Sequence, residues 1–200
     1  MQSINQKIEL PFLSNCTIYI KREDLIHPIV SGNKFRKLKY NIVQAKVENK
    51  TQLLTFGGAY SNHIAAVAYA AKENGFRSIG IIRGDELKSR ISDNPTLRFA
   101  QKCGMEFDFV SREGYRLKEE RTFVENLKQK FGDFYLIPEG GTNELAIKGC
   151  EEILTQDDEI FNYICCSVGT GGTISGLINS LKPNQKVLGF PSLKGDFLGD

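Results

Sequence analysis

The chain alternates short apolar segments with helix-like segments along most of its length, and this alternation constrains the fold more than any other feature. Apolar runs at 51–58, 77–84 and 106–111 read as strands, and apolar residues recur at helical spacing between them. Strands that alternate with helices are typical of βαβ units and a parallel sheet. Because the strands are apolar throughout, we expect helices to cover both faces of the sheet. The sequence therefore predicts an α/β fold.

The complete pattern predicts seven strands and six helices. The expected strands are 17–23, 51–58, 77–84, 106–111, 134–141, 161–168 and 186–193, and the expected helices are 33–49, 61–75, 94–104, 115–132, 143–155 and 173–181. No helix is evident after the last strand. We therefore expect that residue 200 is not the natural end of the fold.

Composition excludes several classes of function. The net charge is +2 with acids and bases interleaved, so nucleic acid is not an expected partner. No apolar stretch is long enough for a membrane span, and the first residues do not resemble a signal peptide. We therefore expect a cytoplasmic protein without a membrane partner.

The five cysteines and two histidines predict neither disulfides nor a metal site. The cysteines are odd in number and scattered, which is typical of a reducing compartment. The spacing of cysteine and histidine does not match that of metal ligands. Adjacent Cys165 and Cys166 lie in an apolar run and are expected to fill a core on a buried strand.

A glycine-rich turn follows the apolar run 161–168 and precedes a helix. Glycines allow close approach of the backbone to a ligand, and free N–H groups at a helix start attract anions. The turn lacks the Gly-Lys-Ser/Thr of a Walker loop, and its glycine spacing is not that of a dinucleotide fingerprint. It predicts a phosphate site, and the alternative is a tight strand–helix connection without a ligand. Its residues are Gly169, Thr170, Gly171, Gly172 and Thr173.

Lys34 stands in the first turn of the expected helix 33–49, within SGNKFRKLKY. The positive end of the helix dipole lowers the pKa of an amine placed there. A lysine of lowered pKa is a nucleophile that forms a Schiff base with an aldehyde. Together with a phosphate loop in an α/β fold, Lys34 suggests pyridoxal 5'-phosphate. The alternative is a solvated surface lysine.

Four segments then carry a family resemblance: KREDLIHPIVSGNKFRKLKY, TFGGAYSNHIAAVAYAAKENG, IPEGGTN and CSVGTGGTISGL. They resemble the fold-type II pyridoxal-phosphate enzymes, and within them the group of 1-aminocyclopropane-1-carboxylate deaminase and D-cysteine desulfhydrase. This resemblance implies two open parallel-sheet lobes with the cofactor in the cleft between them. Residues 1–36 would begin the large lobe, 37–158 would form the small lobe, and 159–200 would start the second part of the large lobe, whose remainder is missing.

The resemblance also implies roles for single residues. Lys34 would bind the cofactor covalently, Asn62 would hydrogen-bond its phenolic oxygen, and Ser61 would act as nucleophile or proton-handling group. Ser61, Asn62 and His63 would bind the substrate carboxylate through their backbone. Residues 169–173 would bind the phosphate, with Lys37 as a cationic helper.

The implied activity is that of a lyase or deaminase acting on a small amino acid. D-cysteine, converted to sulfide, ammonia and pyruvate, is favoured slightly by His63 and the glycine-rich loop. The first alternative is 1-aminocyclopropane-1-carboxylate, converted to 2-oxobutanoate and ammonia. A second alternative, from another class, is a non-catalytic phosphate-binding module. The full-length enzyme is expected to be a homodimer.

Overall fold

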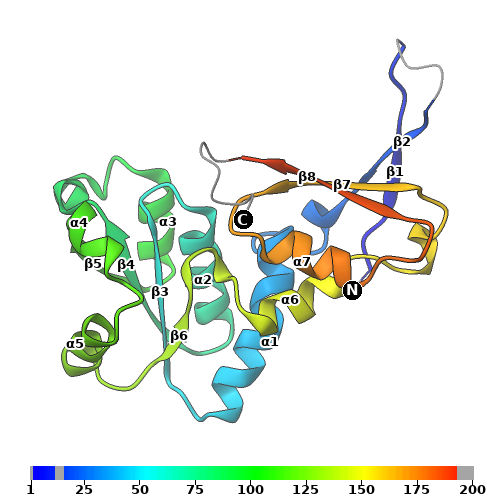
Figure 1. The fold of residues 1–200 in the computed structure, drawn as a ribbon. Coiled ribbons are helices and arrows are strands. Elements are labelled where there is room, and N and C mark those ends of the chain that lie inside the picture. Colours follow the sequence, from blue (N-terminus) through cyan, green and yellow to red (C-terminus); the bar gives the residue numbers. More distant parts are fainter. Residues whose placement is uncertain (1, 12–15, 193–200) are drawn as a thin grey trace.

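The computed structural model describes residues 2–11 and 16–192. Its strands are β1 (Asn5–Ile8), β2 (Ile18–Lys21), β3 (Gln52–Gly58), β4 (Arg77–Arg83), β5 (Met105–Val110), β6 (Tyr135–Ile137), β7 (Tyr163–Val168) and β8 (Lys186–Pro191). Its α-helices are α1 (Asn33–Val47), α2 (Asn62–Glu73), α3 (Pro95–Lys102), α4 (Arg112–Arg116), α5 (Arg121–Phe131), α6 (Glu144–Glu151) and α7 (Gly172–Asn179). Figure 1 shows this arrangement.

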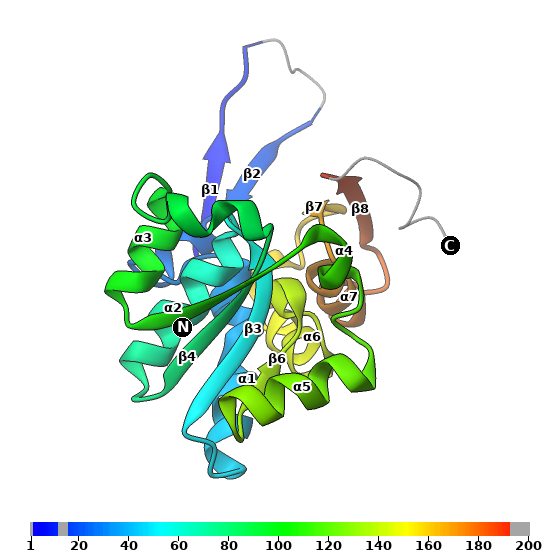
Figure 2. The ribbon, with the colours of Figure 1, turned by 90° about the vertical axis from the view of Figure 1, so that its left-hand side faces the viewer.

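The larger sheet is parallel and has the strand order β5-β4-β3-β6. Successive side chains of a strand face opposite sides of a sheet. Leu53 of β3 accordingly packs with α2 and α3 in one apolar cluster, whereas Leu54 and Phe56 pack with α4 and α5 in another. Helices therefore cover both faces of this sheet, as the sequence predicts (Figure 2).

Helices α1, α6 and α7 pack against one another beside the smaller β7–β8 sheet. Two glycines allow the close approach. A Cβ atom added at Gly149 of α6 would lie 2.0 Å from the carbonyl oxygen of Arg36 in α1. One added at Gly176 of α7 would lie 2.4 Å from the Cβ of Cys150 in α6. The packing brings the start of α1 near the start of α7.

The prediction that all strands are buried is wrong for the smaller sheet. Alternate residues of β7 are exposed, and most of β8 is exposed. Cys165 is exposed and does not fill a core, whereas the half-buried Cys166 packs against the buried cluster of Cys150, Ile153 and Leu177. The physical reason is that α7 covers one face of a sheet whose other face has no described element packed on it (Figure 1). The predicted end of the last strand, at residue 193, lies outside the described residues.

The predicted single helix 115–132 is also wrong. Ser111 caps the short helix α4, and a turn separates α4 from α5. Tyr115 is buried against Phe56, whereas Leu117 is 45 % exposed. The chain turns between the helices because Tyr115 of α4 and Leu127 of α5 both pack in the apolar cluster that contains Leu54 and Phe56. The apolar residues of this stretch have the spacing of one continuous helix in the sequence, which explains the wrong prediction.

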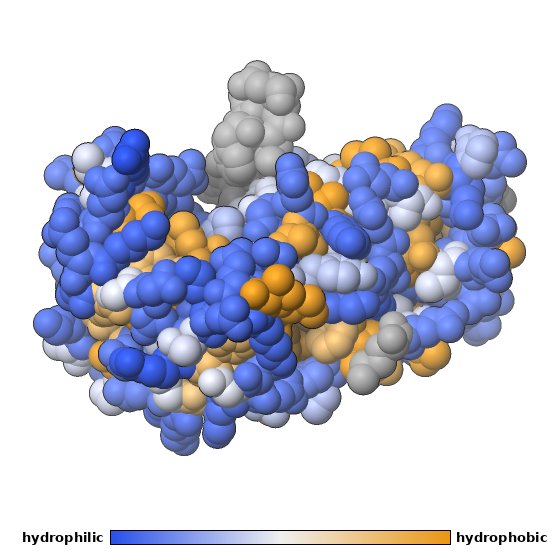
Figure 3. Space-filling view, turned by 90° about the horizontal axis from the view of Figure 1, so that it is seen from below, coloured by the Kyte–Doolittle hydropathy of each residue, from blue (hydrophilic) through white to orange (hydrophobic). Residues whose placement is uncertain are grey.

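Strand β1 was not predicted, and it pairs with β2 in an antiparallel hairpin that projects from the body of the molecule (Figures 1 and 2). The face seen in Figure 3 is mostly hydrophilic, with apolar groups exposed at several separate places. Among residues 2–11 and 16–192, none of the helices combines the length and apolar character that crossing a bilayer requires.

Candidate active site

Lys34 lies in the first turn of α1 and is half-buried. Its Nζ atom donates a hydrogen bond to the carbonyl oxygen of Gly140, 3.1 Å away. Burial, followed by the charge of the neighbouring Lys37, lowers the pKa of the Lys34 amine from 10.5 to about 8. The lowered pKa agrees with the sequence-based expectation, but burial rather than the helix dipole is its leading cause.

Lys37 lies one helical turn further along α1, and only 2 % of its surface is exposed. Its Nζ atom donates to the Gly140 carbonyl at 3.3 Å, to Thr142 Oγ1 at 2.9 Å and to Thr170 Oγ1 at 3.4 Å. Burial lowers the Lys37 pKa. In the described part of the chain no carboxylate pairs with this lysine. A buried cation that has only neutral partners favours an anionic ligand beside it.

The predicted phosphate loop lies against these lysines. Thr170 Oγ1 is 2.6 Å from Thr142 Oγ1, and Asn33 Nδ2 donates to Thr173 Oγ1 at 3.0 Å. Gly171 has a φ of +81°, and a Cβ atom added there would have nothing within 4 Å. One added at Gly172 would lie 3.1 Å from Lys37 Nζ. The loop is therefore open at Gly171 and closely packed at Gly172, as an anion cradle requires.

Ser61, Asn62 and His63 form the start of α2, at the carboxyl end of β3. Ser61 is the N-cap, and its Oγ accepts a hydrogen bond from His63 N at 3.2 Å. Asn62 is exposed, whereas the His63 side chain is buried and hydrogen-bonded to Thr55. In the described residues no hydrogen bond joins Ser61 or Asn62 to Lys34 or to residues 169–173. Hydrogen bonds thus bring Lys34, Lys37 and the loop together but do not include Ser61 or Asn62.

The sequence places Gly140 and Thr142 in the IPEGGTN segment of the family resemblance, but it predicts no role for either residue. Both follow strand β6, in and just after the short helical turn Glu139–Gly141. The Gly140 carbonyl oxygen accepts hydrogen bonds from Lys34 and Lys37, and Thr142 Oγ1 accepts one from Lys37. The signal that points to them is Gly-Gly-Thr at the carboxyl end of a parallel strand, where ligands bind in such folds.

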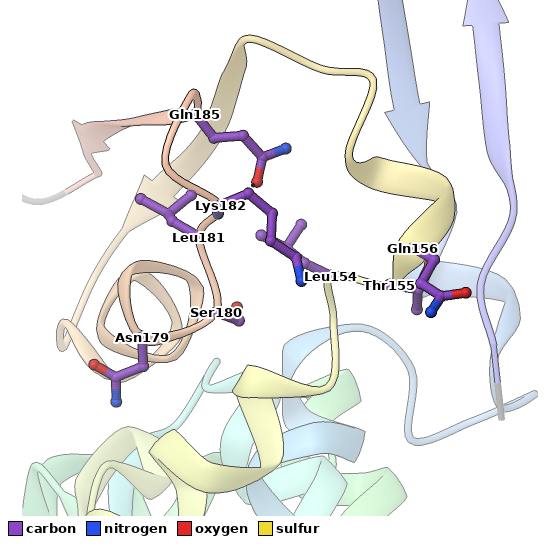
Figure 4. Close-up of a pocket in the computed structure, with 8 residues that line it drawn as sticks. All are labelled: Leu154, Thr155, Gln156, Asn179, Ser180, Leu181, Lys182 and Gln185. Atoms are coloured by element: carbon purple, nitrogen blue, oxygen red, sulfur yellow. Dashed lines mark hydrogen bonds between the residues drawn. The ribbon is translucent and has the colours of Figure 1, made fainter.

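The two cavities found lie elsewhere. One, of about 480 Å³, is lined by residues near the end of α7 and by Leu154 to Gln156 (Figure 4). The other, of about 500 Å³, lies beside the β1–β2 hairpin. None of the predicted site residues lines either cavity. Within the described ranges no cluster of histidine, cysteine and acidic side chains is placed to hold a metal ion.

The site has three features of α/β proteins that bind a phosphorylated aldehyde through a lysine. These are a half-buried lysine of lowered pKa, a second lysine without a counter-ion among the described residues, and a glycine loop at the ends of parallel strands. The family described as "Pyridoxal-phosphate dependent enzyme" matches residues 4–194. The chain therefore belongs to the pyridoxal-phosphate dependent enzymes.

Relatives in this family include proteins with both predicted activities in their names. A Thermotoga maritima protein named "Putative 1-aminocyclopropane-1-carboxylate deaminase" is 37 % identical, over 80 % of this chain and 52 % of its own length. The Arabidopsis thaliana "Bifunctional D-cysteine desulfhydrase/1-aminocyclopropane-1-carboxylate deaminase, mitochondrial" is 31 % identical, over 84 % of this chain and 46 % of its own length. The chain spans about half the length of the curated relatives it matches.

Solved structures confirm the predicted fold class. The crystal structure of an "ACC deaminase homologue" has a TM-score of 0.75 and 28 % identity, and covers 94 % of this chain and 60 % of its own. An O-acetylserine dependent cystathionine beta-synthase from Helicobacter pylori has a TM-score of 0.71 at 18 % identity, over 94 % of this chain and 63 % of its own. This second likeness shows the fold alone.

Proposed function

We propose that this chain forms the cofactor-anchoring part of a lyase or deaminase that acts on a small amino acid. The observation that carries the proposal is the meeting of Lys34, Lys37 and the 169–173 loop around Gly140 and Thr142. D-cysteine is the favoured substrate, and 1-aminocyclopropane-1-carboxylate is the alternative. The names of the relatives support both.

The residues present fit pyridoxal phosphate. Lys34 Nζ would hold the cofactor covalently, because it is a partly deprotonated amine near neutral pH. Lys37 would face the phosphate, with the hydroxyls of Thr142 and Thr170 beside it. The backbone N–H groups around Gly171, which start α7, would donate to the phosphate oxygens. Asn62, on its exposed helix start, would hydrogen-bond the phenolic oxygen.

When bound, pyridoxal phosphate supplies an electron sink for bond cleavage in an amino acid. The Lys34 amine, once released, would hold or return a proton near neutral pH, because its pKa is about 8. Ser61 Oγ would act as nucleophile or proton-handling group, and the free N–H groups at the start of α2 would bind the substrate carboxylate. From D-cysteine, loss of the α proton and the β thiol gives sulfide, followed by ammonia and pyruvate after hydrolysis.

Assembly, location and lobe boundaries belong to the same proposal. We expect the complete protein to be a cytoplasmic homodimer. Residues 1–36 and 159–200 would contribute to one lobe, and 37–158 would form the other. The close packing of α1 with α6 and of α6 with α7 supports a rigid connection between these parts. Size-exclusion chromatography with light scattering tests the dimer.

The activity is tested with the complete protein, loaded with cofactor. Sulfide and pyruvate are measured with D-cysteine, and 2-oxobutanoate with the cyclopropane amino acid. Ser61→Ala should lower turnover at least tenfold, as expected when a proton-handling group is lost. Ser92→Ala removes an exposed hydroxyl whose hydrogen bond is to Asp93 and should have no effect. Cofactor binding without turnover of either amino acid would instead favour the non-catalytic phosphate-binding module.

A further inference from the structure

His63 is buried between strand β3 and the turn that receives the two lysines. Only 2 % of its surface is exposed. Its Nε2 atom is 2.8 Å from Thr55 Oγ1, and Thr55 Oγ1 is also 2.8 Å from the carbonyl oxygen of Ile137. The His63 side chain therefore points into the protein, away from the exposed start of α2.

These two contacts determine the tautomer of His63. A carbonyl oxygen only accepts, so the single hydroxyl proton of Thr55 is donated to Ile137 O. Thr55 Oγ1 must then accept its second hydrogen bond, and His63 Nε2–H is the donor. In a neutral imidazole the other nitrogen is then a bare acceptor. His63 Nδ1 thus carries a lone pair and no proton.

That bare Nδ1 atom is buried and has no hydrogen-bond partner among the described residues. A buried acceptor without a donor costs about 1–3 kcal/mol, so a native donor is expected. A Cβ atom added at Gly141 would lie 3.4 Å from Nδ1, so this edge of the ring rests against Gly141. The preceding carbonyl, Gly140 O, receives the Lys34 amine. Nδ1 and Lys34 Nζ therefore lie beside consecutive residues of one turn.

We propose that His63 is a positioning residue for Lys34: its Nδ1 atom accepts a hydrogen bond from the Lys34 amine while Gly140 O accepts another. Two acceptors fix the direction of the amine more closely than one carbonyl does. Burial, followed by the charges of Lys34 and Lys37, lowers the His63 pKa to about 3, although a hydrogen bond from the ring to the Pro138 backbone acts in the opposite direction. His63 consequently stays a neutral acceptor at physiological pH and does not compete with Lys34 for its proton.

The test is ¹⁵N NMR of the complete protein, labelled at histidine and free of cofactor. His63→Gln identifies the His63 signals among those of the complete protein, and His27 serves as an internal control because its Nδ1 accepts from Val30 N at 2.9 Å. We expect His63 to be protonated at Nε2, with an Nδ1 resonance shifted by a hydrogen bond. Lys34→Met should move that resonance to the position of a free acceptor, whereas Lys37→Met should not. A proton on Nδ1, an unchanged resonance in Lys34→Met, or equal changes in both variants would overturn the proposal.

A second measurement needs no variant and covers the case in which Lys34→Met does not fold. Adding pyridoxal phosphate to the unsubstituted protein should shift the same Nδ1 resonance, because covalent capture removes the free Lys34 amine. This arm rests on the proposed function, whereas the variant arm does not. Failure to capture the cofactor would count against the proposed function alone. Capture at Lys34 with no shift at His63 would contradict the positioning role alone.

Discussion

Lys34 and Lys37 donate to the same acceptor, the carbonyl oxygen of Gly140, at 3.1 Å and 3.3 Å. Two amines on one carbonyl repel each other when both are charged, and burial penalises each charge. Both features support the roles that we propose: covalent binding by the half-buried Lys34 and phosphate binding by the buried Lys37. The predictions below test this division of roles.

Lys37→Met should weaken the binding of pyridoxal phosphate by roughly ten- to a hundredfold, because a charged hydrogen bond contributes about 1.5–3 kcal/mol. The affinity for pyridoxal, which lacks the phosphate, should change little. Equilibrium titration followed by absorbance measures both. Equal losses for the two ligands would mean that Lys37 does not bind the phosphate.

The reaction of Lys34 with pyridoxal phosphate should depend on pH with a midpoint near 8. The amine attacks only when deprotonated, and burial followed by the Lys37 charge lowers its pKa from 10.5 to about 8. The rate constant should therefore rise with pH up to about 8 and level off above it. Lys37→Met removes the like charge and should move the midpoint upward. Stopped-flow absorbance gives the profile, and a midpoint near 10.5 in the unsubstituted protein would be incompatible with this picture.

Gly171→Val should reduce cofactor affinity. Gly171 has a φ of +81°, and the space beside it is open for a ligand. Gly132→Val is a matched control, because Gly132 has a φ of +78° and equally open space at the end of α5. Both variants carry a backbone penalty, which is larger for Gly132→Val because its ψ of −151°, against −32° at Gly171, lies in a region that essentially only glycine adopts; thermal unfolding measures each penalty. Only Gly171→Val should bind the cofactor less tightly, and equal affinities in the two variants would refute the cradle.

Gly149→Ala should lower the free energy of unfolding by about 1–3 kcal/mol or more, because the added methyl group would meet the backbone of α1. The contact is 2.0 Å, to the carbonyl oxygen of Arg36. Chemical denaturation measures the loss. Lys148→Ala, at an exposed neighbouring position of α6, should cost far less. Equal stabilities would show that α1 and α6 are not as close as described.

Most strands and helices follow from local periodicity, which explains why the sequence predicts the α/β fold and the loop after β7. Whether a strand is exposed depends on what packs on it, because the same apolar residues occur in buried and in exposed strands. Cys165 is an example, since it lies in an apolar strand and is exposed. The break before α5 was missed because Leu117 continues the apolar stripe although it is 45 % exposed.

The candidate site was only partly predictable for a related reason. Lys34 and the glycine loop have local signatures, a lysine at a helix start and a glycine run at a strand end. The contact of Lys37 with Thr142 joins residues far apart in the chain, and it arises only when α1 packs against α6. The inward direction of His63 likewise depends on Thr55, a partner on another element.

The most direct test of the central claim is the identity of the lysine that binds the cofactor. The complete protein is loaded with pyridoxal phosphate, reduced with borohydride, digested and mapped by mass spectrometry. We expect a single pyridoxyl group on Lys34, and loss of this label, with the fold intact, in Lys34→Ala. A pyridoxyl group on Lys37 or on any other lysine of the unsubstituted protein would contradict it.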